Sequence, residues 1–391
     1  MVKIIKELLG DLPRILIKTF LISRDSKKRT GQTFVTISNA IMTLVCISSM
    51  YFLGLEKSLE GTASFSAYAF IIATKHVIYY FRQDEIKRML NIFARLQKEY
   101  KEKWEREIFK RDSEDTWNMV YKFCLIMISY QVFYLMFTIS VDYIIGNIFP
   151  NFPSVRVHLP CDGFIEFFEP RTLGRFIITI PVLMWTAEAI TIHVGSETLV
   201  FVLMMYTKSE LKMIRYRLII IKKQLNRNKS NCSVNAEMLL WEVIQRHQRA
   251  LDVLDVMKDT LGLPLAIHYT SVSVTLSVIF YCLMTFDERG TLTAKFNGIT
   301  AIICIGSLLF ALCYFGESLE EENNEINKRI YDLPWYNESI FVKRAIIIML
   351  RQTQKPFVIN YRLTAQLSLQ TFMQVINTAY SYLMVLKSTV R

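Results

Sequence analysis

Long apolar blocks separated by charged blocks are the main pattern of this chain. Seven stretches contain no Asp, Glu, Lys or Arg, and they cover residues 30–55, 61–74, 123–141, 176–187, 261–286, 296–316 and 363–386. A helix needs about 20 apolar residues to cross a hydrocarbon layer about 30 Å thick. The first, third, fifth, sixth and seventh stretches meet that requirement unaided. The pattern therefore predicts an all-α membrane protein.

The second and fourth stretches reach membrane length only if they include ionisable residues. The second extends to residue 81 with Lys75 and His76, and the fourth covers 172–206 with Glu188, His193 and Glu197. A helix over 172–206 would be about 50 Å long, so part of it must protrude from the bilayer or pack against protein. Isolated charges in lipid are expensive, which makes these five residues candidates for function. Buried pairing or cytosolic exposure explains them as well, and we assign them a structural role.

Positive charge is concentrated on one side of the seven predicted helices. The segments 1–32, 82–117, 207–260 and 317–362 together contain 36 Lys and Arg residues, whereas the segments on the other side contain 7. Because Lys and Arg accumulate in cytoplasmic loops, the bias predicts a cytosolic N-terminus and, after seven crossings, an extracellular C-terminus. This orientation is opposite to that of a G-protein-coupled receptor, which stays a remote alternative.

Composition and charge fit a membrane protein and argue against other classes. The chain is 52% hydrophobic with a net charge of +11, and membrane topology explains that charge without nucleic acid. The first residues alternate charges with short apolar pairs, which predicts an amphipathic cytosolic helix rather than a cleavable signal peptide. The sequence has no HExxH or GxSxG pattern, no paired metal-binding cysteines and no phosphate-binding Gly loop. We therefore expect no enzyme activity, no metal and no cofactor.

The predicted cytosolic segments have the pattern of amphipathic helices. Apolar residues recur at spacings of three, four and seven in 237–261, and a similar period continues through Leu319, Asn323, Ile326 and Ile330. One subunit alone would leave such stripes exposed to water, so they predict oligomerisation. The expected organisation is a cytosolic N-terminal amphipathic segment (1–32), helices one to six (33–316) with the cytosolic helical loop 207–260, cytosolic anchor helices (317–362), and a seventh helix (363–391).

The seventh predicted helix carries a polar stripe. Its members follow one another at spacings of three and four, so they share one helix face, and they are Thr371, Gln374, Thr378, Ser381, Val385 and Ser388. Ser, Thr and Gln on such a face either line a water-filled pore or form hydrogen bonds with a neighbouring helix. The residues alone leave both readings open.

Three segments in the last third of the chain resemble the C-terminal region of insect odorant receptors. They are YDLPWY at 331–336, MLRQTQKP at 349–356 and SLQTFMQVINTAYSYLMVL at 368–386. Members of that family usually have Arg-Ser or a similar pair before Gln-Lys-Pro, where this chain has Gln352 and Thr353. Gustatory-type channels of the same superfamily are the alternative. They usually end their last helix in Thr-Tyr followed by Gln-Phe, and the ending AYSYLMVLK lacks the Gln-Phe pair.

The resemblance implies a ligand-gated, non-selective cation channel of four subunits, with the seventh helices around a central pore. In this family a divergent odorant-binding subunit assembles with a common co-receptor, whose loop between helices four and five is longer. The corresponding loop here, 207–260, is modest, so the chain resembles the tuning subunit, in the plasma membrane of olfactory neuron dendrites. The resemblance favours a pore-lining role for the polar stripe. Val385 is then expected to form part of the gate, because a ring of apolar side chains closes a pore by dewetting.

A volatile organic ligand needs a mostly apolar cavity with few polar groups, which directs attention to the outer halves of helices two to six. The candidate residues there are Phe65, Tyr68 and Ile72 on the second helix, Tyr130, Phe133, Phe137 and Ser140 on the third, Ile177, Ile180, Pro181 and Met184 on the fourth, and Tyr281 and Thr300 on later helices. Aromatic side chains also fill membrane bundles routinely, so the set predicts a location rather than individual contacts.

Overall fold

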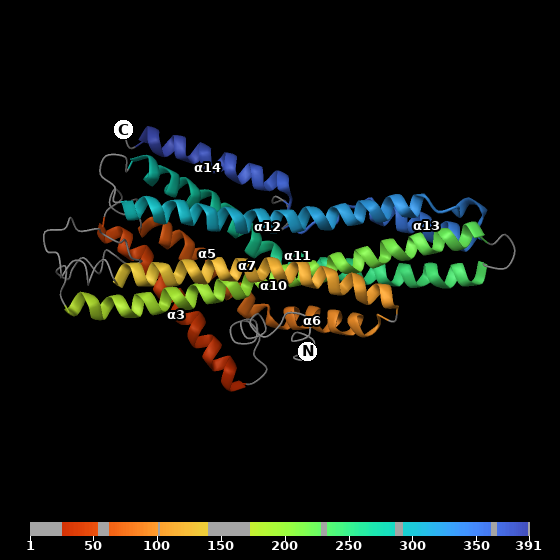
Figure 1. Cartoon of the computed structure of the whole chain (residues 1–391), viewed down its shortest axis with the longest axis horizontal. Coiled ribbons are helices and arrows are strands. Elements are labelled where there is room, and N and C mark those ends of the chain that lie inside the picture. Colours follow the sequence, from red (N-terminus) through yellow and green to blue (C-terminus); the bar gives the residue numbers. More distant parts are fainter. Residues whose placement is uncertain are drawn as a thin grey trace.

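The described part of the chain is a bundle of seven long helices with two short ones at its sides (Figure 1). The computed structural model describes residues 26–53, 62–100, 102–139, 173–227, 233–285, 292–360 and 366–389. The long helices are α3 (Ser26–Leu53), α5 (Thr62–Phe81), α7 (Lys103–Ile139), α10 (Leu173–Arg227), α11 (Ser233–Thr285), α12 (Leu292–Tyr331) and α14 (Leu369–Thr389). The short ones are α6 (Gln83–Lys98) and α13 (Ile340–Thr353), the latter preceded by a 3-10 turn at Trp335–Asn337. The prediction of an all-α, seven-helix architecture is confirmed.

Among the described residues, four helices are long and apolar enough to cross a membrane by length and composition alone. Within the described residues these spans are Thr33–Phe52, Ile180–Asn226, Glu237–Met284 and Gly298–Tyr331. The fourth predicted helix qualifies only by including ionisable residues, as expected, because Glu188 and Glu197 interrupt its apolar stretch before it reaches 18 residues. The third predicted span, 123–141, extends past the described side chains and stays a prediction. The seventh, which was expected to qualify, does not belong to this set. In α14 the amide side chains of Gln370, Gln374 and Asn377 interrupt the run of apolar residues.

Several helices continue from the predicted membrane region into the predicted cytosolic region without a break. The helix α10 has 55 residues, which corresponds to about 80 Å, and α11 has 53. The expected domain boundaries near residues 207 and 317 therefore fall inside α10 and α12. Figure 1 shows α10, α11 and α12 running along the bundle, with α13 beside their far ends. We call this end, predicted to be cytosolic, the inner end.

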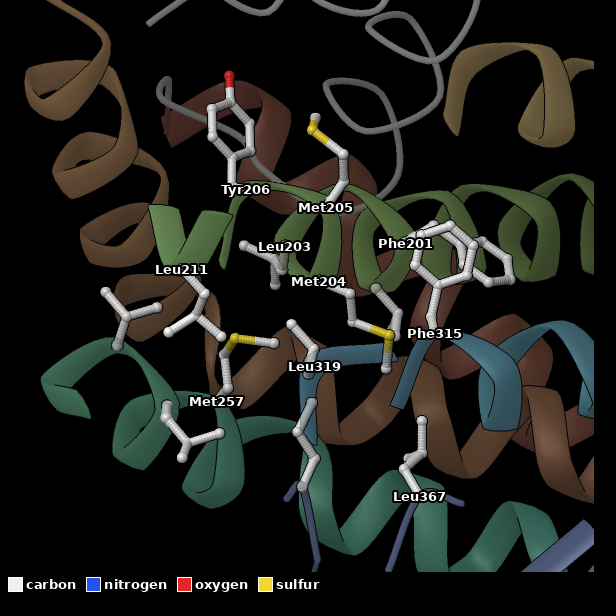
Figure 2. Packing of buried hydrophobic residues seen from close by; sticks show 14 of the residues in the cluster. Phe201, Leu203, Met204, Met205, Tyr206, Leu211, Met257, Phe315, Leu319 and Leu367 are labelled. Carbon is white, nitrogen blue, oxygen red and sulfur yellow. The ribbon is translucent and has the colours of Figure 1, made fainter. Parts of the chain in front are cut away.

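The main core lies where α10, α11 and α12 meet (Figure 2). The rings of Phe201 on α10 and Phe315 on α12 have centroids 5.5 Å apart. Leu319, one turn further along α12, is buried, as is Leu367 just before α14. The α12 backbone approaches Leu367 closely at Gly316, where a β-carbon would lie 2.3 Å from the Leu367 carbonyl oxygen. Only glycine fits there without movement of the chain, so this contact fixes where α14 begins.

The amphipathic stripes at the inner end pack against one another within a single chain. The α12 residues Leu319, Asn323, Ile326 and Ile330 are buried, as the period predicted. Leu240, Leu254 and Leu261 of α11 and Ile346 and Met349 of α13 belong to the same core. The argument that these stripes require a second subunit is therefore wrong, because neighbouring helices of the same chain cover them. A different set on α13 is exposed, namely Ile340, Phe341, Ile347 and Ile348.

Buried ion pairs fix the inner ends of α7, α10 and α11 to one another. Glu105 is inaccessible to solvent, and its Oε1 lies 2.6 Å from Arg217 Nη2 and 3.1 Å from Arg246 Nη2. The Tyr100 hydroxyl donates a hydrogen bond to Glu210. Burial and then the nearby Glu210 carboxylate raise the pKa of Tyr100 well above its ordinary value, so the phenol keeps its proton. These contacts join α7, α10 and α11 at the inner end of the bundle.

Candidate ligand-binding region and channel helix

A small apolar cluster separate from the main core lies between α3, α5 and α10. We call it the outer cluster, because it lies toward the predicted extracellular end, and its buried members are Cys46, Ala69, Ile72, Trp185, Ala189 and Ile192. Tyr68 of α5 packs against it, as do Val35, Met42 and Val45 of α3. Small side chains such as Ala69 and Ala189 let helices approach closely. The indole of Trp185 is the largest buried side chain in the cluster.

Polar side chains of α3 hold this indole in position. The Trp185 Nε1–H donates to Asn39 Oδ1 at 3.2 Å, and the Asn39 amide nitrogen donates to the Val35 carbonyl at 3.0 Å. The Thr43 hydroxyl donates to the Asn39 carbonyl at 2.7 Å. A buried indole N–H needs a partner, so Asn39 fixes which way Trp185 points. The outer cluster thus has one defined arrangement, to which all three helices contribute.

A group of buried polar side chains lies next to the outer cluster on the inner side. We call it the polar cluster, and its members are Lys75 and Tyr79 of α5, His193 and Glu197 of α10, and His268 of α11, all at most 2% exposed. Lys75 donates to Glu197. His193 Nδ1 lies 3.6 Å from Glu197 Oε1. The ring centroids of His193 and His268 are 6.4 Å apart. Three helices therefore bring ionisable groups together that are far apart in sequence.

The two clusters are in direct contact through aromatic rings. Tyr68 packs against the outer cluster, and its ring meets that of His193 edge to face, with centroids 5.3 Å apart. The sequence singled out Lys75, His193 and Glu197 and left buried pairing and cytosolic exposure both open, and in the structure Lys75 and Glu197 are buried and paired. His76 is also buried, and Glu188 is half-buried on α10. His268 and Trp185 were missed, because a lone His or Trp in an apolar stretch carries no sign of its partners.

The residues expected to form the ligand site do not all face the same space. Tyr68 and Ile72 meet at the outer cluster, whereas Ile180, Pro181 and Met184 are exposed on α10. Tyr281 packs elsewhere, with Leu383 of α14, and Thr300 is half-buried on α12. The side chains of Phe65, Tyr130, Phe133, Phe137 and Ile177 and the whole of Ser140 lie outside the described residues. On α10, Trp185 rather than its neighbour Met184 points toward α3 and α5.

The final helix packs on the bundle with one face and leaves its polar edge uncovered. Val375, Ala379 and Leu383 are buried, and α14 lies along α11 and α12. The Ser277 hydroxyl of α11 donates to the Ala379 carbonyl at 2.9 Å. Most of the expected stripe lies on the other side, with Gln374, Ser381, Val385 and Ser388 exposed and Thr378 half-buried. Thr371 differs, because it is buried and donates to the Gln366 carbonyl at 2.5 Å at the start of the helix.

These features define a helical membrane protein with an enclosed apolar cluster near one end and a C-terminal helix whose polar edge leaves the bundle. The family model described as 7tm odorant receptor matches residues 58–380, so the chain belongs to the insect odorant receptor family. The recognition based on three C-terminal segments is confirmed. This is a family of receptors rather than enzymes.

Individual odorant receptors that resemble this chain agree with the assignment. The odorant receptor coreceptor of Harpegnathos saltator is 26% identical over 158 residues, which cover 40% of this chain and 32% of that protein. Odorant receptor 49a of Drosophila melanogaster is 23% identical over 287 residues, which cover 69% of this chain and 65% of that protein. The match to the co-receptor thus spans only about a third of the length of that protein.

Solved structures share the fold over nearly the whole chain. The olfactory receptor OR5 of Machilis hrabei in complex with eugenol superposes with a TM-score of 0.75 at 13% identity, and 99% of each chain is covered. The structure of the same receptor described without a ligand gives a TM-score of 0.70 at 14% identity, covering 98% of this chain and 97% of that one. At such low identity the likeness describes the fold alone.

Proposed function

We propose that this chain is the odorant-binding subunit of an odorant-gated, non-selective cation channel that assembles with the common co-receptor. The observation that carries the proposal is the polar edge of α14, which faces away from the chain's own helices. A helix that packs on α11 and α12 with one face and presents amides and hydroxyls on the other is suited to meet water or equivalent helices. Family membership supports a receptor-channel role, and the modest 207–260 loop supports the tuning role.

In this proposal four such helices surround the pore, in the plasma membrane of olfactory sensory neuron dendrites. Val385 is 60% exposed near the outer end of α14, which is the position that a ring of apolar side chains in this proposal requires. Such a ring would close the pore by dewetting. Within the described residues the stripe contains no charged side chain, which matches weak selection among cations.

The odorant in this proposal binds at the outer halves of the helices, on the side where Tyr68 and Ile72 meet Trp185. An apolar cluster with few polar groups has the chemistry expected of a site for a volatile organic molecule. Binding opens the channel only if the ligand prefers the open arrangement, because a ligand with equal affinity for both states shifts nothing.

Assembly in this proposal uses the exposed face of α13. Ile340, Phe341, Ile347 and Ile348 are each more than half exposed. The Ser339 hydroxyl donates to Glu237 at 2.7 Å, so this face lies beside the start of α11, where Met238 and Trp241 are also exposed. Apolar patches of this kind mark protein–protein contacts, and the co-receptor or a second copy of this chain would cover it.

The test is to record currents from cells that express this chain alone, the co-receptor alone, or both, across an odorant panel. Odorant-evoked current that needs both chains supports the tuning-subunit proposal, whereas robust current from this chain alone contradicts it. Two neighbouring variants then locate the site. Trp185→Ala should change odorant potency without changing ion permeability, and a larger effect of Met184→Ala would move the site to the other side of α10.

A further inference from the structure

The polar cluster contains buried polar atoms that lack hydrogen-bond partners among the described residues. Both ring nitrogens of His193, both ring nitrogens of His268, Glu197 Oε2 and the Tyr79 hydroxyl have no hydrogen-bond partner among the described residues. All four side chains are at most 2% exposed. Buried polar groups in proteins are nearly always paired, and a group that stays unpaired is costly. So many unpaired atoms in one enclosed place indicate an occupant that supplies hydrogen bonds.

The faces of α5 and α10 that enclose this place change character from the outer to the inner end. On α10, Trp185, Ala189, His193 and Glu197 follow one another at a spacing of four, so they form one stripe. On α5, Tyr68, Ile72, Lys75 and Tyr79 form a second stripe at spacings of four and three. Both stripes begin with aromatic or apolar residues and end with polar ones. A molecule lying between them would meet apolar surface first and hydrogen-bonding groups at its inner end.

The unpaired groups define the chemistry of that inner end. A neutral imidazole has one N–H donor and one acceptor nitrogen, and a carboxylate oxygen accepts. The occupant must therefore both donate and accept within a small space, as a hydroxyl group does. An acidic ligand would bring a second anion beside Glu197, and an amine would bring a second cation beside Lys75, since these two already neutralise each other. An ether or ketone can accept a hydrogen bond but cannot donate one.

We propose that the polar cluster is a hydroxyl-binding subsite, formed chiefly by His193, His268 and Glu197, which selects alcohols and phenols among volatile ligands. The apolar part of such a ligand lies against the outer cluster, and its hydroxyl reaches past Tyr68 to the imidazoles. This inference rests on the proposed function, because it names the ligand class of the same receptor. It also assigns His268 of α11 to ligand recognition.

The experiment compares three matched probe series on the channel formed with the co-receptor. The series are primary alcohols of four to ten carbons with 2-phenylethanol, the methyl ethers of these compounds, and the corresponding hydrocarbons. Wild type should respond to alcohols at lower concentrations than to the ethers. His193→Phe should lower the alcohol-to-ether potency ratio by about tenfold or more, because a site built around a hydroxyl discriminates strongly. His193→Gln keeps one donor and one acceptor group and should retain most of the preference.

His247→Phe is the matched control, because it makes the same change at a buried histidine of α11 in the inner part of the bundle. It should leave the alcohol-to-ether ratio unchanged. An unchanged ratio in both His193→Phe and His268→Phe would overturn the subsite, since internal water would then satisfy the unpaired atoms. Activation by esters or hydrocarbons without any activation by alcohols would overturn it as well.

A binding measurement separates this inference from the proposed function. The purified wild-type complex in lipid nanodiscs is heated with an alcohol or with its methyl ether, and the unfolding midpoint is compared. Greater stabilisation by alcohols supports the subsite even if no compound evokes a current, an outcome that would contradict the proposed function alone. Equal stabilisation by alcohols and ethers, or none by either, contradicts the subsite.

Discussion

Replacing Gly316 with alanine tests the close contact between α12 and the segment that starts α14. A β-carbon at this position would lie 2.3 Å from the carbonyl oxygen of Leu367 and 2.6 Å from its Cβ. Packed carbon atoms are separated by about 3.5–4.0 Å, so either α12 or the segment at Leu367 must move by about 1 Å. The obstacle includes backbone as well as Cβ, and a change of rotamer cannot relieve it. The variant should therefore shift the beginning of α14.

The size of the effect follows from two opposing terms. Overpacking a well-filled contact costs about 1–3 kcal/mol. Alanine in a helix interior is favoured over glycine by about 1 kcal/mol, which offsets part of that loss. The expected net result is a destabilisation of about 0–2 kcal/mol for Gly316→Ala, which is about 1–3 kcal/mol worse than a Gly→Ala change without overpacking. The hydrogen bond from the Leu369 N–H to Glu317 at 3.2 Å should weaken with it, since both contacts join the same two segments.

Two other glycines provide a graded control. Nothing lies within 4 Å of a β-carbon at Gly306, also on α12, so Gly306→Ala should be neutral or stabilising. Gly298→Ala should be intermediate, because its nearest neighbour is the flexible Leu283 side chain at 3.0 Å. The measurement is the temperature at which the purified receptor is lost from its size-exclusion peak, together with odorant-evoked current. Equal midpoints for the three variants, or a Gly316→Ala receptor as stable as Gly306→Ala, would refute the packing argument.

Three further predictions concern two buried ion pairs and the proline inside α11. Lys75→Met should destabilise the fold by about 3 kcal/mol or more by leaving Glu197 unpaired, and the double variant Lys75→Met/Glu197→Leu should recover most of that in thermal unfolding. A double variant less stable than Lys75→Met would contradict this. Glu105→Gln should lower the free energy of unfolding by about 3 kcal/mol, whereas Lys103→Ala, in an exposed pair, should cost less than about 1 kcal/mol. Pro264→Ala should straighten α11 and reduce odorant-evoked current at equal surface expression, and a current equal to that of wild type would exclude a hinge there.

Much of the fold could be predicted because hydrophobic length and charge bias are local properties of the sequence. The period of Leu319, Asn323, Ile326 and Ile330 marked one face of a helix, and all four are buried. The partners of such a face are not local. The same stripes suggested a second subunit, yet α10, α11 and α13 of the same chain cover them. A stripe predicts that a surface will be buried, but it does not say by which helix.

The candidate site was harder to predict, because the sequence of a membrane helix that is apolar on all sides does not show which face is buried against the protein. Met184 and Trp185 are adjacent, yet Met184 is 69% exposed and Trp185 is 7% exposed. Hydrophobicity does not separate them; the hydrogen bond from Trp185 to Asn39, 146 residues away in sequence, does. Charged residues were more informative, because Lys75 and Glu197 would be costly within the membrane unless they were paired or in contact with water. The sequence left buried pairing and exposure as alternatives, and only the structure identified the pair.

The long helix α11 connects the features described above and suggests how they act together. Its inner part carries Arg246, which is held by Glu105 of α7 at the inner end. Pro264 lies inside the helix and has no N–H to donate to the carbonyl of Thr260, so the helix is weakened at that turn. His268 and Ser277 both lie on the outer side of this proline, about 14 Å apart along one helix. If the proposed ligand displaces the segment at His268, we expect the Ser277 hydroxyl, which donates to α14, to move with it while the inner part stays in place.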